Sequence, residues 1–137
     1  MTVHPVDPAP LAGDWANFDT TATGIDLLGA AVDGSRLMLR ITERGDPTTS
    51  HTTPEPETTP VTDAVLPAVP LADDIDASEA VAFLAEGPLG SRQVVLVGYL
   101  NRGLLTIDVH TVHPVHARMP NVMYRAHFYR LEGPTPP

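Results

Sequence analysis

Short apolar runs that alternate with polar residues recur along this chain, and no long stretch has helical periodicity. Leu37, Leu39 and Ile41 alternate with polar residues, which is typical of a strand with one buried face. The preceding Asp33-Gly34 pair suits the positive φ angles of a tight hairpin. The pattern therefore predicts an antiparallel sheet wound toward closure.

Further runs are separated by turn residues, at 25–31, 81–85, 93–100, 104–112 and 122–131. Counting hairpins gives about seven or eight strands in up-and-down order. We therefore predict an all-β fold, an antiparallel up-and-down β-barrel. At this strand number the interior is filled by side chains or holds one small ligand.

The chain has 137 residues, of which 42% are hydrophobic, enough for one core. We predict a flexible N-terminal arm at 1–10, a single barrel domain at 11–132 and a flexible tail at 133–137. Within the barrel, residues 45–62 are rich in Thr, Pro and Glu and predict a mobile loop, either a functional lid or a disordered insertion.

The net charge of −9 argues against partners with phosphate backbones or anionic lipid surfaces, so we expect neither nucleic acid nor membrane. The chain has no cysteine, which excludes disulfides and thiolate chemistry. Residues 1–7 have neither a basic region nor an apolar region of a secretory signal, so we expect a cytoplasmic protein. Whether two barrels pair as a homodimer stays open.

The apolar positions of each strand predict the lining of the interior. Tyr124, Tyr99 and Thr111 would add hydrogen-bonding groups, and we take them as the candidate catalytic residues. Small residues at Gly29, Ala31, Gly98 and Ala126 favour a real cavity over a solid core. The strand parity of Ile25 and Leu27 points both of them inward. The candidate ligand-binding residues are Trp15, Leu27, Leu39, Ile41, Phe83, Ile107, Val109 and Phe128.

Gly13-Asp14-Trp15 on the first strand, with an arginine on the last, resembles the calycin arrangement of lipocalins and avidins. That resemblance implies that Trp15 packs against Arg130, or alternatively Arg125, at one barrel end. Gly13–Asn17, Thr23–Ile25, Gly103–Leu105 and His127–Arg130 are also similar to a set of small, mostly uncharacterised bacterial barrel proteins. The loop at 45–62 has no counterpart in that layout.

Two groups of polar residues are candidates for a metal site and for an acid-base site. His110, His113 and His116 are spaced for one helical face, but the segment leaves a strand and meets Pro114, so we expect no metal site. Asp108 and His110 on one strand could lie beside Arg125 and His127 on the next. Because the opposite parities are apolar, we expect this polar patch outside the barrel, with a structural or subunit-contact role favoured over acid-base catalysis.

The chain lacks a Gly-x-Ser-x-Gly nucleophile motif, a phosphate-binding glycine loop and a dinucleotide site, so we expect no cofactor. The first functional hypothesis is a cofactor-independent cyclase or isomerase that folds a mostly apolar, polyketide-type natural-product intermediate inside the barrel. Fold-level analogy with natural-product cyclases motivates it. The alternative is a non-catalytic, lipocalin-like carrier of a small hydrophobic molecule. A third is a subunit-interaction module with a solid barrel.

Overall fold

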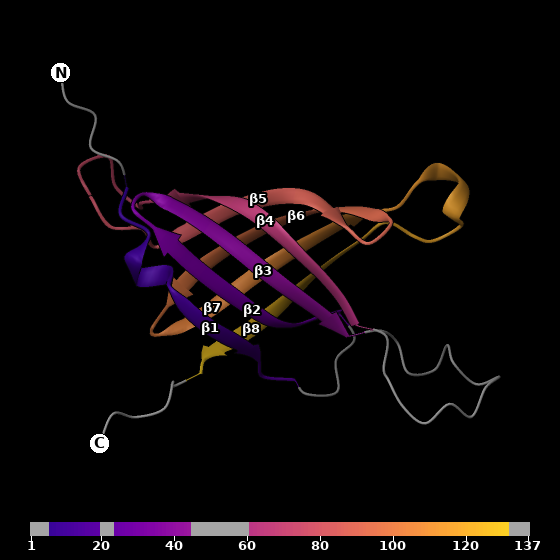
Figure 1. Ribbon diagram of the computed structural model, residues 1–137, viewed down its shortest axis with the longest axis horizontal. Coiled ribbons are helices and arrows are strands. Elements are labelled where there is room, and N and C mark those ends of the chain that lie inside the picture. The colour runs from indigo at the N-terminus through magenta and orange to yellow at the C-terminus, as the bar shows by residue number, and fades with distance from the viewer. Residues whose placement is uncertain (1–5, 20–23, 45–60, 132–137) are drawn as a thin grey trace.

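The computed structural model describes residues 6–19, 24–44 and 61–131, and these form a closed antiparallel β-barrel (Figure 1). Each strand pairs with the next in sequence, and β1 pairs with β8 to close the barrel. This confirms the predicted up-and-down fold. In the described residues the strands are β1 (Gly13–Asn17), β2 (Gly24–Asp33), β3 (Arg36–Arg44), β4 (Val61–Leu71), β5 (Ala82–Leu89), β6 (Arg92–Asn101), β7 (Leu104–Val112) and β8 (Val122–Arg130).

The two ends of the barrel differ. The start of β1 and the end of β8 lie at one end, which we call the terminal end, together with the short 3-10 helix η1 (Ala9–Leu11) (Figure 1). At the other end, which we call the loop end, β2, β4, β6 and β8 begin. There the connection between β7 and β8, with the 3-10 helix η3 (Val115–Ala117), projects beyond the barrel (Figure 1).

The inner faces of all eight strands meet in one apolar core. Along most of each strand alternate residues face inward, and the side chains in the middle of the barrel are almost completely buried. Phe83 and Phe128 lie in this core, and burial of each such side chain contributes about 1.5–3 kcal/mol. The inward residues include Leu37, Leu39 and Ile41 from β3, Leu96 from β6, and Leu105, Ile107 and Val109 from β7.

A β-bulge in β2 changes which of its residues face the core. Ile25 pairs with Glu43 but Leu27 pairs with Thr42, so Asp26 is an extra residue without a position in the ladder. The alternation therefore shifts by one, and Leu28 is 1% exposed while Leu27 is 40% exposed. The prediction that Leu27 faces inward with Ile25 is wrong, because strict alternation does not survive an inserted residue.

Large side chains occupy the space that small inward residues leave. A Cβ atom at Gly98 would overlap the ring of Phe83, and a Cβ at Gly87 would lie 2.5 Å from Leu66 Cδ2. Gly29 lies instead beside Asp14 and Arg40, and Ala31 is exposed. Gly98, Gly29 and Ala31 therefore do not support a cavity as expected, because Phe83 fills the space at Gly98 and the other two do not face the core. The fourth small residue, Ala126, is a buried core residue.

Two side chains, Trp15 and Arg130, pack together at the terminal end. Trp15 is buried, and its indole Nε1 donates a hydrogen bond to the Leu11 carbonyl 3.0 Å away. The Arg130 guanidinium lies over the Trp15 ring, 4.6 Å from its centroid, and donates to the Pro10 carbonyl at 2.6 Å. Gly13 has a φ of +126° and no side chain in the path of Arg130. This confirms the predicted partner of Trp15.

The segment that precedes β1 contacts the barrel. Residues 6–10 of the predicted arm are among the described residues: Asp7 forms a parallel bridge with Glu79 in the connection between β4 and β5, and Val6 packs against the core. The predicted loop at 45–62 lies outside the described residues except for Val61 and Thr62, which begin β4, and the predicted tail lies wholly outside them. No helix in the described ranges has the length and apolar character needed to cross a membrane.

Candidate functional site

The inward faces of the strands become polar at the loop end. Glu43 continues the inward row of β3, Arg92 begins that of β6, Thr111 ends that of β7, and Tyr124 begins that of β8. Thr111 is 5% exposed. It pairs with Val122 on β8, two residues before Tyr124. Polar side chains on an apolar parity require partners, because unpaired burial costs free energy. These four residues, Glu43, Arg92, Thr111 and Tyr124, form the candidate site.

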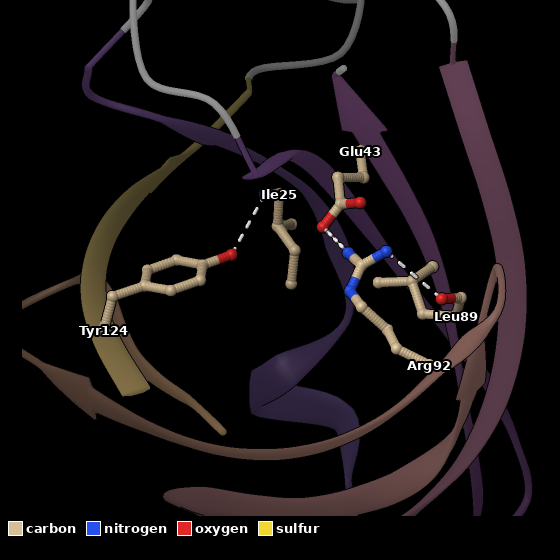
Figure 2. Close-up of polar contacts among 5 residues, drawn as sticks. All are labelled: Ile25, Glu43, Leu89, Arg92 and Tyr124. Atoms are coloured by element: carbon tan, nitrogen blue, oxygen red, sulfur yellow. Dashed lines mark hydrogen bonds and ion pairs between the residues drawn. The ribbon is translucent and has the colours of Figure 1, made fainter. Parts of the chain in front are cut away.

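A backbone hydrogen bond from β2 fixes the Tyr124 phenol inside the barrel. The Ile25 backbone N–H donates a hydrogen bond to the Tyr124 phenol oxygen at 3.3 Å (Figure 2). The same oxygen would overlap a side chain at Gly24, which has a φ of +108°, so glycine is needed there. Burial raises the pKa of the Tyr124 phenol above its ordinary value, despite the opposing hydrogen bond from Ile25. The phenol therefore stays neutral and keeps its own proton to donate.

Tyr124 links β8 to β2 beyond the last pair of β1 and β8. The β1–β8 pairing ends at Asn17 and Phe128, whereas β8 continues toward the loop end as far as Val122. Beyond Asn17, the Phe18 N–H still donates to the His127 carbonyl at 3.0 Å. Side chains from β8 and β1 hold the backbone of Ile25 on β2: Tyr124 accepts from its N–H, and Asn17 Nδ2 donates to its carbonyl at 3.0 Å.

Opposite Tyr124, an ion pair joins two strands that are not neighbours. Arg92 on β6 pairs with Glu43 on β3 across the barrel, over β4 and β5 (Figure 2). Arg92 Nη1 also donates to the Leu89 carbonyl at 3.2 Å. The two side chains are 17% and 15% exposed. Figure 2 shows the Ile25 side chain between this pair and Tyr124.

A hollow lies beside Tyr124, near the end of β1. Its volume is about 280 Å³. The rings of Phe18 and Tyr129 lie 5.1 Å apart beside it, and Phe18 is 55% exposed. Tyr124 thus borders both the interior and this hollow. The lining residues are Asn17, Phe18, Asp19, Tyr124, Arg125, Ala126 and His127.

The structure separates the three candidate catalytic residues. Tyr124 and Thr111 face inward at the loop end. Tyr99 occupies one of the outward-facing positions of β6 and is half-buried. It pairs with Thr106 on β7. The expectation that Tyr99 adds a polar group to the interior is therefore wrong, since its neighbours Gly98 and Leu100 hold the inward positions.

The predicted lining residues other than Leu27 are buried in the core, but they extend along the whole barrel. Trp15 lies at the terminal end, far along the strands from Tyr124, where it contacts η1 and Arg130. The others are Leu39, Ile41, Phe83, Ile107, Val109 and Phe128, each 0–1% exposed.

The polar patch predicted on the outside is present. Arg125 donates to both carboxylate oxygens of Asp108, at 2.7 and 3.2 Å, and these hydrogen bonds hold the pKa of Asp108 below its ordinary value. His127 Nδ1 lies 3.0 Å from the Thr106 hydroxyl. Among the described residues, no three histidine or carboxylate side chains are placed to hold a metal ion.

Comparison with known proteins finds no matching family model, no matching curated sequence and no matching solved structure. Inference about function therefore depends on the geometry of the loop end.

Sequence reasoning missed Glu43 and Arg92. A signal was present, because both continue rows of apolar inward residues: Glu43 follows Leu37, Leu39 and Ile41 at alternate positions, and Arg92 precedes Val94. A charge that extends an apolar parity predicts a buried pair or a strand end in solvent. Their pairing across two intervening strands could not be read from the sequence.

Proposed function

We propose that this protein binds one small, mostly apolar molecule with a carbonyl group at the loop end of the barrel, and promotes its cyclisation or isomerisation without a cofactor. The supporting observation is Tyr124, a neutral phenol fixed by the Ile25 N–H, with no described acceptor for its own proton. Such a donor stabilises negative charge that develops on a carbonyl oxygen. The surrounding apolar core would exclude water.

The packed interior limits where the ligand fits. Phe83, Phe128 and their neighbours fill the middle of the barrel, so a ligand would lie between Tyr124 and the Glu43–Arg92 pair, in the place of the Ile25 side chain, while the Ile25 backbone keeps its position. Both charged groups already have partners there. A neutral ligand is therefore favoured over an anion, because an anion would meet the Glu43 carboxylate as well as Arg92.

We also propose that the barrel is calycin-like. Support comes from the Trp15–Arg130 contact, the Gly13 that leaves room for it, and the 3-10 helix that precedes the first strand at the same end. Fold likeness of this kind does not fix an activity. The ligand class rests on the loop end alone.

A non-catalytic carrier is the second candidate. Its support is that the only hydrogen-bond partner of the Tyr124 phenol among the described residues is a backbone N–H. A catalytic phenol that cycles its proton normally has an acid-base partner in reach. Glu43 interacts with Tyr124 only through space, and it is held by Arg92.

The test uses 2′-hydroxychalcone, an apolar ketone that cyclises to flavanone by internal addition. Calorimetry measures binding of both compounds, and absorbance follows the cyclisation. We expect one molecule bound per chain and an accelerated cyclisation that falls by about 10- to 1000-fold in Tyr124→Phe. Tight binding without acceleration favours the carrier, and absence of binding by either compound refutes both functions.

Tyr99→Phe is the matched control, since it removes a phenol from the outer face of β6. Tyr124→Phe also removes the partner of the Ile25 N–H, so its melting temperature must be measured. A rate loss in folded Tyr124→Phe and none in Tyr99→Phe identifies the inward phenol. Equal losses in both variants would contradict its role.

A further inference from the structure

The connection between β7 and β8 differs in charge from the rest of the chain. Residues 109–131 contain three arginines and four histidines, and all 17 acidic residues lie outside this range. Within it, residues 113–121 project beyond the loop end of the barrel (Figure 1), and we call them the extension. A basic segment in a chain of net charge −9 suits an acidic partner.

The extension keeps its shape by its own hydrogen bonding but leaves its side chains in solvent. Across its base, the His113 N–H donates to Asn121 Oδ1 at 2.7 Å. Val115 is fully exposed and Met119 is 58% exposed. Arg118 is exposed as well, and among the described residues it has no ion-pair partner. The extension therefore presents apolar side chains beside an uncompensated cation, a combination typical of a contact surface.

An acidic surface lies at the opposite end of the barrel. The connection between β4 and β5, residues 72–81, is at the terminal end (Figure 1) and has four acidic residues but no basic one. In the described chain none of these carboxylates pairs with an arginine. Ile75 beside them is 97% exposed. This connection borders a hollow of about 370 Å³, which we call the acidic hollow, lined by Val6, Ala72, Asp73, Asp74, Ile75 and Ala77.

We propose that the extension of one copy docks in the acidic hollow of a second copy, so that barrels associate end to end. The Arg118 guanidinium faces the carboxylates of Asp73 and Asp74, and Val115 packs on Ile75. Because the two surfaces differ and lie at opposite ends, the contact is heterologous, and each added copy exposes one extension and one hollow again. The association is separate from the proposed function.

A second copy fits the extension better than an anionic membrane does. The extension has one arginine, whereas the whole chain has a net charge of −9, which an anionic surface repels. The acidic hollow instead offers carboxylates together with an exposed apolar side chain of its own, Ile75. Both features of the extension thus find their complement on the same chain.

Sedimentation velocity of the full chain at pH 7 tests the contact. The weight-average coefficient should rise continuously with protein concentration. Association should weaken by about 3- to 10-fold from low salt to 0.5 M NaCl, because the ion pairs are exposed. A chain that stays monomeric up to about 1 mM, or one whose association stops at a dimer, would overturn the proposal.

Charge exchange identifies the two surfaces. Arg118→Glu and Asp73→Lys should each weaken association by about 10-fold, since each places like charges together. The double variant restores opposite charges and should associate more tightly than either single variant. Arg102→Glu and Glu86→Lys are the matched controls and should not weaken association; Arg102 has a φ of 54° beside 55° at Arg118, but lies in the β6–β7 turn. Losses in the controls, or a double variant weaker than both single ones, would refute the contact.

Spectra of ¹⁵N–¹H amide pairs at rising protein concentration show which residues meet. Signals from 113–121 and from 72–77 should shift together. Shifts confined to the outer faces of the strands would assign the association to another surface and overturn the proposal. So would a monomeric chain whose extension binds phosphatidylglycerol vesicles, because lipid would then be the partner.

Discussion

Replacement of Arg92 should lower the free energy of unfolding more than loss of an exposed charged residue does. Arg92→Met leaves the Glu43 carboxylate inside the loop end without its ion pair and the Leu89 carbonyl without a donor. Breaking a fully buried pair costs about 3–5 kcal/mol, whereas exposed pairs contribute about 0–1 kcal/mol. Since both side chains are more than four-fifths buried, we expect a loss of about 2–4 kcal/mol.

The assay is urea unfolding at pH 7, followed by the fluorescence of Trp15, the one tryptophan of the chain, and by far-ultraviolet circular dichroism. Coincident transitions would justify a two-state free energy. The matched control is Arg40→Met. Arg40 pairs with Asp63 at 3.5 Å on the outside, where the side chains are 71% and 50% exposed, and its loss should cost about 0–1 kcal/mol.

The double variant Glu43→Leu/Arg92→Met separates pairing from burial. Replacing both charges with apolar side chains removes the cost of leaving either one unpaired, so the double variant should be more stable than Arg92→Met. Arg92→Met costing no more than Arg40→Met would refute the reasoning. So would a double variant whose loss equals the sum of the two single losses.

Three other predictions test the ends of the barrel and the bulge. Arg130→Met should cost about 1–3 kcal/mol in urea unfolding, because Trp15 loses its cation; an unchanged midpoint would contradict that. Leu27→Ala should change stability by about 0.5 kcal/mol or less, whereas Leu28→Ala should cost about 2–5 kcal/mol; the reverse order would place the bulge elsewhere. Because burial raises the pKa of Tyr124, the folded state keeps that proton to higher pH than the unfolded chain. Its contribution to stability is present below the ordinary tyrosine pKa of about 10 and is lost as pH rises through the folded value, so Tyr124→Phe should lose less stability above pH 10 than the wild type.

Local pattern predicted most of the strands because each has one buried face. Leu37, Leu39 and Ile41 occupy alternate positions, and all three are fully buried as that alternation requires. The calycin resemblance predicted the contact between Trp15 and Arg130, and the structure shows it between the first and last strands of the barrel. The inward position of Tyr124 followed in the same way from its parity.

The alternation of apolar residues did not predict features that depend on how neighbouring strands pair. One inserted residue, Asp26, reversed the facing of Leu27, and only the pairing with β3 reveals it. Gly98 is small because Phe83 lies over it, a contact between side chains on neighbouring strands that parity does not specify.

The amino-acid sequence by itself determined that this chain forms one antiparallel barrel with an apolar interior, because the alternation of side chains is a local property of each strand. The tertiary structure alone decided the character of the loop end. Glu43 meets Arg92 across two intervening strands, and Tyr124 reaches Ile25 where β1 has ended. Both contacts depend on where the barrel brings distant strands together and on how far each strand extends, and neither quantity is encoded in the residues of one strand.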